Sequence, residues 1–219
     1  MLLASGSPRR ADLLTTLGIE PLISPADIDE RPRPGETATQ LVERLASEKA
    51  VAGWQAWSSA QEAPNDDASA STWWMVVAAD TVVEIDGTIL GKPEDRAEAK
   101  QMLLMLSGKA HRVHSGLAVG LAAGLESSID PIKAVETTTV HMRTLDTDTI
   151  KWYIDTDEPL DKAGAYAIQG KASVLVDRID GSFSNVVGLP VAVLDRLCRR
   201  LDWPLHRMTV TDPRTRAVR

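Results

Sequence analysis

The sequence predicts an α/β fold, and two observations support this prediction. At the very start, residues 2–4 form a short apolar run that leads directly into a loop and a helix, and a strand–loop–helix unit is typical of α/β proteins. Further along, the continuous apolar run 75–79 ends at Asp80, as a buried strand would. The 219 residues suffice for one large domain or for two small lobes that share a core.

Turn and capping signals divide the rest of the chain into alternating elements. Pro8 fits the first position of a helix, Ser7 fits its N-cap, and Gly18 fits its end. Residues 37–40 have the capping-box pattern that opens a second helix. Asp86-Gly87 is the strongest hairpin signal in the chain. Helices are expected at 8–17, 38–54, 93–107, 147–154 and 190–201, and further strands at 81–85, 88–90, 113–120, 134–142 and 171–179.

Three segments fall outside this pattern. Residues 55–72 are rich in Ser, Ala, Asp, Asn and Gln, and we interpret them as a surface insertion. Residues 122–131 separate two predicted strands and form a second variable loop. Residues 202–219 are rich in Arg and show no apolar periodicity. We therefore expect one domain over residues 1–201, followed by a flexible C-terminal tail.

Charge and composition argue against several classes of protein. The net charge of −7 disfavours a general nucleic-acid or anionic-membrane binder, because such proteins normally carry a basic excess. No stretch reaches the roughly 18 apolar residues of a membrane span, and the N-terminus lacks the basic region of a signal peptide. The single cysteine, Cys198, lies in an apolar helical run and is interpreted as a core residue. These features predict a cytoplasmic protein that binds neither nucleic acid nor membrane.

Two arginines in the first turn of the first predicted helix indicate anion binding. The helix dipole opposes cations there by roughly a few tenths of a kcal/mol, so Arg9 and Arg10 go against the local preference unless an anion is bound. The hydroxyls of Ser5 and Ser7, the free backbone N–H groups and the guanidinium groups together would form a phosphate site. The alternative is a solvated basic turn that pairs with Asp or Glu elsewhere. Spacing alone leaves both interpretations open.

Four further charged residues are candidates for a site. Asp80 follows a buried strand, so it either caps a turn or faces a ligand at the strand's carboxyl end, and aspartate is a natural Mg²⁺ ligand. Glu30 lies in an acidic loop, where the alternative is a solvated charge. Lys49 flanks the apolar stripe of its helix and either snorkels to water or points into a cleft. Lys92 lies between a hairpin and a helix, a typical position for a binding loop.

Taken together and in order, these residues resemble the Maf family of nucleoside triphosphate pyrophosphatases. The resemblance extends from Leu2 to about Leu201. It rests on short motifs at compatible spacing, which are ASGSPRR at 4–10, DIDE at 27–30, EKA at 48–50, ADTVV at 79–83, GKP at 91–93, DKAGAYAIQG at 161–170 and NVVGLP at 185–190. The resemblance implies hydrolysis of dTTP and UTP to the monophosphate and pyrophosphate, with Mg²⁺ or Mn²⁺ as cofactor, and suggests a homodimer. We expect an elongated molecule with a mixed central sheet, helices on both faces and a cleft between two lobes.

Catalytic roles follow from the same resemblance. Asp80 matches the general base, and Asp80 and Glu30 together match the carboxylates that hold the metal. Arg10, Lys49 and Lys92 match the basic residues that bind the triphosphate and stabilise the departing pyrophosphate. The chemistry is reasonable because a triphosphate carries about four negative charges that must be neutralised during in-line attack.

Recognition of the nucleotide is assigned to four other residues by the resemblance. Ser7 matches a position that contributes a hydroxyl or N–H group, and Arg9, Thr81 and Gln169 match positions linked to base selection. The amide of Gln169 offers a donor and acceptors to the O–N–O edge of a pyrimidine. Two alternatives remain at this stage: a nucleotide-binding regulator of cell division or septum formation that does not hydrolyse its ligand, and an enzyme of the same class with another base preference.

Overall fold

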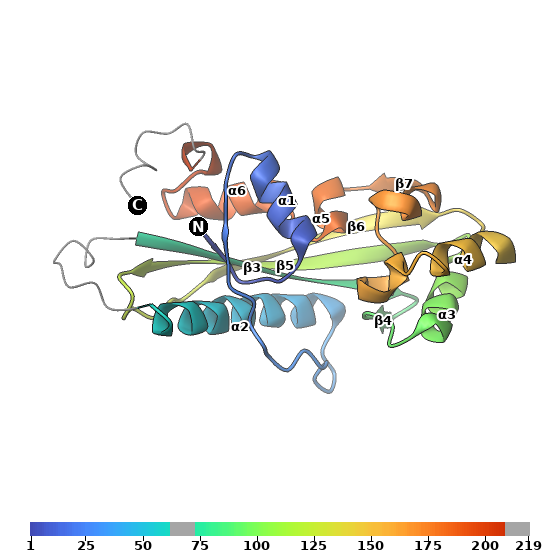
Figure 1. Ribbon diagram of the computed structural model, residues 1–219, viewed down its shortest axis with the longest axis horizontal. Coiled ribbons are helices and arrows are strands. Elements are labelled where there is room, and N and C mark those ends of the chain that lie inside the picture. The colour runs from blue at the N-terminus through green and yellow to red at the C-terminus, as the bar shows by residue number, and fades with distance from the viewer. Residues whose placement is uncertain (62–72, 209–219) are drawn as a thin grey trace.

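A mixed β-sheet forms the centre of the computed structural model, which describes residues 1–61 and 73–208. Seven strands have the order β2-β1-β3-β5-β6-β7, with β4 paired to β3 outside this path. β1 and β2 run parallel to their neighbours, whereas the other pairs are antiparallel. The molecule is elongated, with helices on both faces of the sheet (Figure 1). The predicted fold class is therefore confirmed.

The helices and strands cover most of the described chain. The strands are β1 (Leu2–Leu3), β2 (Leu22–Ile23), β3 (Trp73–Ile85), β4 (Thr88–Leu90), β5 (Ala110–Ala123), β6 (Ile132–Met142) and β7 (Val176–Asp180). The α-helices are α1 (Pro8–Thr16), α2 (Ala38–Ser59), α3 (Arg96–Leu106), α4 (Thr147–Ile154), α5 (Phe183–Val187) and α6 (Val191–Arg200). Short 3₁₀ helices are η2 (Glu158–Asp161), η3 (Ala163–Ala165), η4 (Gly170–Val174) and η5 (Leu205–Arg207).

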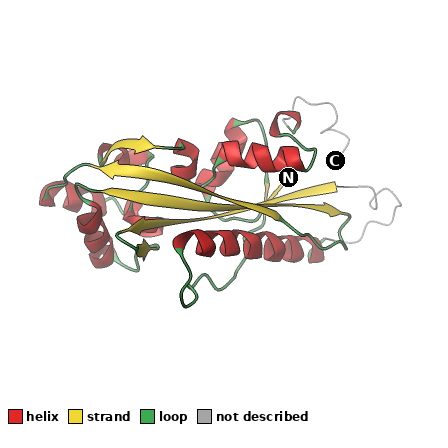
Figure 2. Cartoon of the chain, turned by 180° about the vertical axis from the view of Figure 1, so that it is seen from behind, coloured by secondary structure: helices red, strands yellow, loops and turns green. Residues whose placement is uncertain are grey.

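Side chains of β3 alternate between the two faces of the sheet. Met75, Val77 and Ala79 pack in a core with α1 and α6, whereas Val76 and Ala78 pack in a core with α2. Figure 1 shows α2 on one side of the strands and α1 and α6 on the other, and Figure 2 shows the same layers from behind. Because both faces of this part of β3 are covered, its sequence is continuously apolar rather than alternating.

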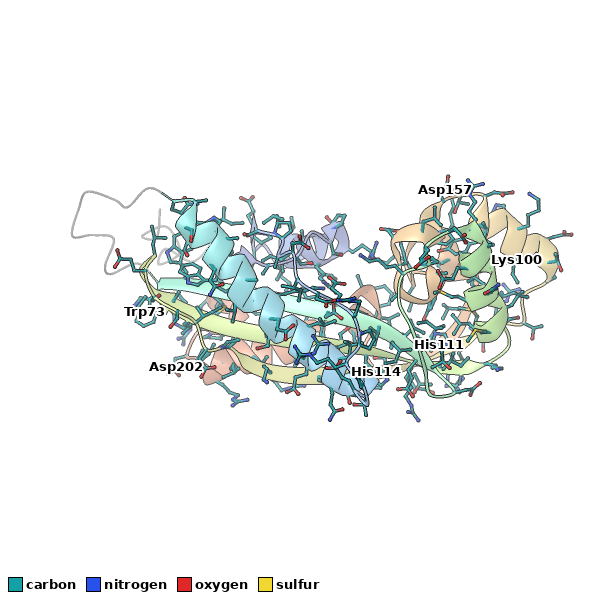
Figure 3. The ribbon with its side chains drawn as sticks, turned by 90° about the horizontal axis from the view of Figure 1, so that it is seen from below. Trp73, Lys100, His111, His114, Asp157 and Asp202 are labelled. Atoms are coloured by element: carbon teal, nitrogen blue, oxygen red, sulfur yellow. The ribbon has the colours of Figure 1, made fainter. Side chains whose placement is uncertain are left out.

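A second lobe forms where the long strands extend beyond these helices. Val83 and Ile85 of β3 pack with apolar side chains of α3 and α4 in a separate core. Figure 3 shows Asp157 at this end of the molecule and Trp73 at the other. The two lobes thus share the strands β3 and β5, as the expected two-lobed architecture requires.

The backbone of α2 lies very close to the sheet. A Cβ atom added to Gly116 of β5 would lie 2.0 Å from the carbonyl oxygen of Val42, and one added to Gly53 of α2 would lie 2.4 Å from the Cβ atom of Ala4. Glycine is required at both contacts because any side chain would overlap its neighbour. Lys49 lies in the buried face of this helix, which packs against the sheet.

Local turn and capping predictions are confirmed. Asp86 and Gly87 both have positive φ angles, 51° and 79°, as a two-residue type I′ hairpin requires. The capping box of Thr37 and Gln40 is present in both directions. The helix over residues 147–154 begins and ends where the sequence predicted.

Several element boundaries were predicted incorrectly, among them those of β5, which spans Ala110–Ala123 rather than residues 113–120. Helix α2 continues to Ser59, into the segment interpreted as an insertion. Helix α3 begins at Arg96 rather than residue 93, because Asp95 accepts a hydrogen bond from the Glu98 N–H group and caps the helix there. The strand expected from residue 171 begins only at Val176, because residues 170–174 form η4.

The segments outside the predicted pattern are partly described. Residues 62–72 of the first insertion and 209–219 of the expected tail lie outside the described residues. In the second loop, the Ser127 carbonyl accepts a hydrogen bond of 2.6 Å from Trp54 Nε1 of α2. Beyond α6, Trp203 and Leu205 pack against the core that contains α1 and α6.

The structure also bears on the role of the single cysteine and on the search for membrane-spanning segments. Cys198 of α6 is fully buried, and burial raises the pKa of its thiol to about 12, so the core interpretation is confirmed. In the described ranges, no helix combines the length and apolar character of a membrane span.

Candidate active site

A cavity of about 910 Å³ lies between the two lobes. Six basic and four acidic side chains line it, so the cavity has a local positive excess in a chain whose net charge is −7. Such a cavity attracts anions. All nine residues predicted for the site line this cavity, namely Ser7, Arg9, Arg10, Glu30, Lys49, Asp80, Thr81, Lys92 and Gln169.

An ammonium group joins two carboxylates in this cavity. The Nζ atom of Lys49 lies 2.6 Å from Asp80 Oδ1 and 2.6 Å from Glu30 Oε1. The side chains of Lys49 and Asp80 are 11% and 9% exposed, whereas that of Glu30 is 54% exposed. Lys49 therefore points into the cleft rather than to bulk water. Since a buried charge without a partner is costly, each residue of the Lys49–Asp80 pair stabilises the other.

The position of Asp80 differs from the prediction. The sequence placed it at the carboxyl end of a strand, but β3 continues without interruption to Ile85. The strand that does end near the site is β1, whose Leu3 pairs with Val77 of β3. The cavity therefore opens at the carboxyl end of β1. Strand β3 continues past this end of β1, and Asp80 lies in the part of β3 that continues. This is the edge at which ligands commonly bind in α/β sheets.

Three segments of the chain hold the guanidinium group of Arg10. Its Nε atom donates to the Gly188 carbonyl at 2.7 Å, Nη1 donates to Ser5 Oγ at 3.0 Å, and Nη2 donates to Thr81 Oγ1 at 3.2 Å. Burial lowers the pKa of Arg10, and two nearby carboxylates oppose this effect. An arginine keeps its charge under such conditions. Because all three hydrogen-bond acceptors are neutral, the positive charge is available to an anion.

The other predicted residues also line the cavity. Arg9 Nη1 lies 3.2 Å from Asp161 Oδ2, so this exposed ion pair connects α1 to the second lobe. Lys92 and Gln169 line the cavity from that lobe. Ser7 occupies the N-cap position of α1 without a side-chain capping bond, and its N–H group donates to Ser5 Oγ. Arg9 thus has a carboxylate partner, whereas the acceptors of Arg10 are neutral.

Sequence reasoning missed the residues that hold Thr81 in place. The Thr81 hydroxyl lies 2.8 Å from Ser115 Oγ, and Ser115 Oγ donates to the Asn185 carbonyl at 3.1 Å. Asn185 is fully buried and donates through Nδ2 to a carbonyl of β5 and a hydroxyl of β6. Ser115 faces Thr81 because β3 and β5 pair in this register, which no local signal in the sequence specifies.

Two carboxylates are available to a metal ion. Across residues 1–61 and 73–208, no group of three or more His, Cys, Asp or Glu side chains is positioned to hold one. Magnesium commonly takes only one or two protein carboxylates and completes its shell with water and substrate phosphates. Asp80 and Glu30, which contact the same ammonium group, match that donor set. The site therefore fits a divalent cation that binds together with a phosphate ligand.

Comparison with known proteins identifies the family. A family model described as "Maf-like protein" matches residues 1–201. The chain belongs to the Maf family. Its Maf relatives include the dTTP/UTP pyrophosphatase of Anaeromyxobacter sp. (strain Fw109-5), 43% identical over 205 residues that cover 94% of this chain and 91% of the relative. The dTTP/UTP pyrophosphatase of Myxococcus xanthus (strain DK1622) is 45% identical over 207 residues, covering 93% and 95% of the two chains.

Proposed function

We propose that this Maf protein hydrolyses dTTP and UTP to the nucleoside monophosphate and pyrophosphate. The observation that supports this most strongly is the pair of carboxylates, Asp80 and Glu30, inside a cavity with a positive excess. A protein that only binds triphosphates gains nothing from acidic residues beside the phosphates unless it also binds a metal. The names of the Maf relatives, which are dTTP/UTP pyrophosphatases, support the same reaction.

Asp80 and Glu30 would hold the cation, which we propose to be Mg²⁺ or Mn²⁺. When bound, such a cation neutralises phosphate charge and lowers the pKa of a bound water. Both metals accept carboxylate and water ligands, so the donor set does not distinguish between them.

The residues of the chain supply the remaining chemistry. Water attacks the α-phosphorus, the bond from that phosphorus to the bridging oxygen breaks, and the electron pair leaves with pyrophosphate. Asp80 accepts the proton of the attacking water. Arg10, Lys49 and Lys92 stabilise the charge that develops on the departing pyrophosphate. Ser7 adds an N–H or hydroxyl group at the start of α1, where the helix dipole favours anions.

Base selection involves Arg9, Thr81 and Gln169. Uracil and thymine present two carbonyl oxygens flanking an N–H group, and the amide of Gln169 can donate to one of these oxygens and accept from the N–H group. Cytosine presents an amino group in place of one carbonyl, so the same amide orientation leaves a polar group without a partner. Leaving such groups unpaired is what makes polar sites selective.

One experiment separates this function from its alternatives. The protein is incubated with dTTP, UTP, CTP, dATP and GTP in the presence of Mg²⁺ or Mn²⁺, and monophosphate, pyrophosphate and phosphate are measured. We expect pyrophosphate and monophosphate in equal amounts, fastest from dTTP and UTP. Binding without turnover would instead support a nucleotide-binding regulator of cell division, and a different order of substrates would support another base preference.

We further propose that residues 1–201 form the catalytic domain and that the protein is a cytoplasmic homodimer. The match of the Maf family model to this range supports the domain assignment. Light scattering of the purified protein tests the dimer, since a monomer would have a mass of 23.7 kDa.

A further inference from the structure

The segment that presents Gln169 to the cavity has little regular structure of its own. Gln169 lies in the irregular stretch between η3 and η4, and Gly170, which follows it, has a φ angle of 70°. Glycine adopts this left-handed conformation readily, but it leaves the backbone more freedom than other residues do. A side chain that reads a base must be held in one orientation. Contacts from elsewhere in the chain therefore have to position Gln169.

The carboxylate of Glu158 makes those contacts. Glu158 Oε2 accepts a hydrogen bond of 3.2 Å from the Lys171 N–H group, and Oε1 accepts one of 3.3 Å from the Ala172 N–H group. These donors lie in the first turn of η4, where backbone N–H groups have no partner within the helix. A Cβ atom added to Gly170 would lie 3.0 Å from Glu158 Oε1. The carboxylate thus packs directly against the residue that follows Gln169.

Glu158 is itself fixed to the core of the second lobe. Tyr153 of α4 is fully buried, and its hydroxyl donates to Glu158 Oε1 at 3.2 Å. Burial, and then the charge of Glu158, raise the pKa of Tyr153, so the hydroxyl keeps its proton and remains a donor. The Glu158 carbonyl also accepts a hydrogen bond of 3.0 Å from Lys162 Nζ, and Lys162 lines the cavity. A continuous chain of contacts therefore connects α4 to the Gln169 segment.

We propose that Glu158 is a positioning residue for base selection, which acts by fixing Gln169 through the first turn of η4. This inference rests on the proposed pyrimidine selectivity. Glu158 has no need to touch the nucleotide, because two of its hydrogen bonds hold the backbone on the C-terminal side of Gln169 and a third, from the Tyr153 hydroxyl, holds the carboxylate itself. Loss of the carboxylate would free the amide of Gln169 to rotate and to accept cytosine as well as uracil.

Steady-state kinetics with UTP and CTP test this proposal. We expect Glu158→Ala to lower the ratio of kcat/KM for UTP to that for CTP by about tenfold, as we expect for Gln169→Ala. If Glu158 acts through Gln169, the variant that carries both substitutions will have the same ratio of kcat/KM for UTP to that for CTP as Gln169→Ala alone. Glu158→Gln keeps one acceptor oxygen, so its selectivity should lie between those of wild type and Glu158→Ala. If Glu158→Ala does not fold, Glu158→Gln takes its place in the experiment.

A matched control separates positioning from general stability. Asp146→Ala removes another capping carboxylate of the same lobe, which accepts a hydrogen bond of 2.7 Å from the Thr149 N–H group. This variant should keep the wild-type selectivity. Hydrogen exchange without nucleotide adds a readout independent of turnover: the amides of Lys171 and Ala172 should lose protection in Glu158→Ala and keep it in Asp146→Ala.

The outcomes distinguish a failure of the role proposed for Glu158 from a failure of the proposed pyrimidine selectivity. If wild type discriminates between UTP and CTP but Glu158→Ala lowers kcat/KM equally for both, Glu158 has only a structural role and the proposal is wrong. Unchanged protection of Lys171 and Ala172 in Glu158→Ala would also overturn it. If wild type itself does not discriminate, the proposed pyrimidine selectivity fails, and the role of Glu158 fails with it.

Discussion

Replacing Asp80 with Asn changes the charge and basicity of this side chain but hardly its size. Asp80 Oδ1 lies 2.6 Å from Lys49 Nζ, and the Asn oxygen can still accept from that ammonium group. Lys49 also keeps its contact with Glu30. We therefore expect the variant to fold, with a free energy of unfolding lower by about 1–3 kcal/mol, the usual cost of weakening a buried hydrogen bond to a charge.

The effect of Asp80→Asn on turnover should be far larger. A positioned general base contributes about 10²–10⁴-fold to a rate, and this substitution also removes one of the two carboxylates assigned to the metal. We expect kcat for dTTP to fall by at least about 10³-fold. Binding of a non-hydrolysable dTTP analogue should change by no more than about 1.4 kcal/mol, or tenfold in Kd, because the basic residues of the cavity are unchanged.

Asp86→Asn is the matched control for this substitution. Asp86 belongs to the hairpin that follows β3, its side chain is 75% exposed, and it pairs with Lys109 at 3.1 Å. Asparagine tolerates the positive φ angle of 51° at this position. Pyrophosphate release by Asp86→Asn should equal that of wild type. If Asp80→Asn also retains turnover within about tenfold of wild type, Asp80 is not the general base.

Three further predictions concern other parts of the structure. Arg10→Lys removes the planar guanidinium group that donates to three acceptors. The value of kcat/KM, measured by pyrophosphate release, should therefore fall by about 100-fold, and a decrease of less than about threefold would contradict the role of Arg10. Burial, and then the charge of His141, lower the pKa of His111 to about 4, so its contribution to stability is complete above pH 6.5 and is lost as the pH falls toward 4. In urea titrations, the free energy of unfolding of wild type should therefore fall by about 3 kcal/mol relative to that of His111→Gln between pH 7 and pH 4. A difference between the two proteins that stays constant with pH would refute this. Gly116→Ala places a Cβ atom 2.0 Å from the Val42 carbonyl oxygen. We expect its free energy of unfolding in urea to be lower than that of wild type by more than about 3 kcal/mol. A decrease of less than about 1 kcal/mol would show that α2 can move away from the sheet.

Signals that depend on neighbouring residues were predictable from the sequence. Asp86-Gly87 formed the expected hairpin because both residues tolerate positive φ angles, and residues 37–40 formed a capping box because its partners lie three residues apart. The motifs that contain the nine predicted residues were recognised together, and all nine residues line one cavity.

Features that depend on distant contacts were not predictable. The sequence suggested a strand end at Asp80, since a carboxylate rarely continues a buried run, but Lys49 of α2 pairs with it and lets β3 continue. The 3₁₀ helix η4 replaces the first part of a predicted strand because Glu158 accepts from its N–H groups across 13 and 14 residues of sequence. Helix α5 was also missed, although its Ser182 caps it by accepting from the Asn185 N–H group.

The most direct test of the proposed reaction follows the oxygen of the attacking water. UTP is hydrolysed by the protein in H₂¹⁸O with Mg²⁺, and the products are analysed by mass spectrometry. Attack at the α-phosphorus, with Asp80 as the base, places one ¹⁸O atom in UMP and none in pyrophosphate. An ¹⁸O atom in pyrophosphate, or release of single phosphates, would show attack at another phosphorus and would contradict the function proposed for this Maf protein.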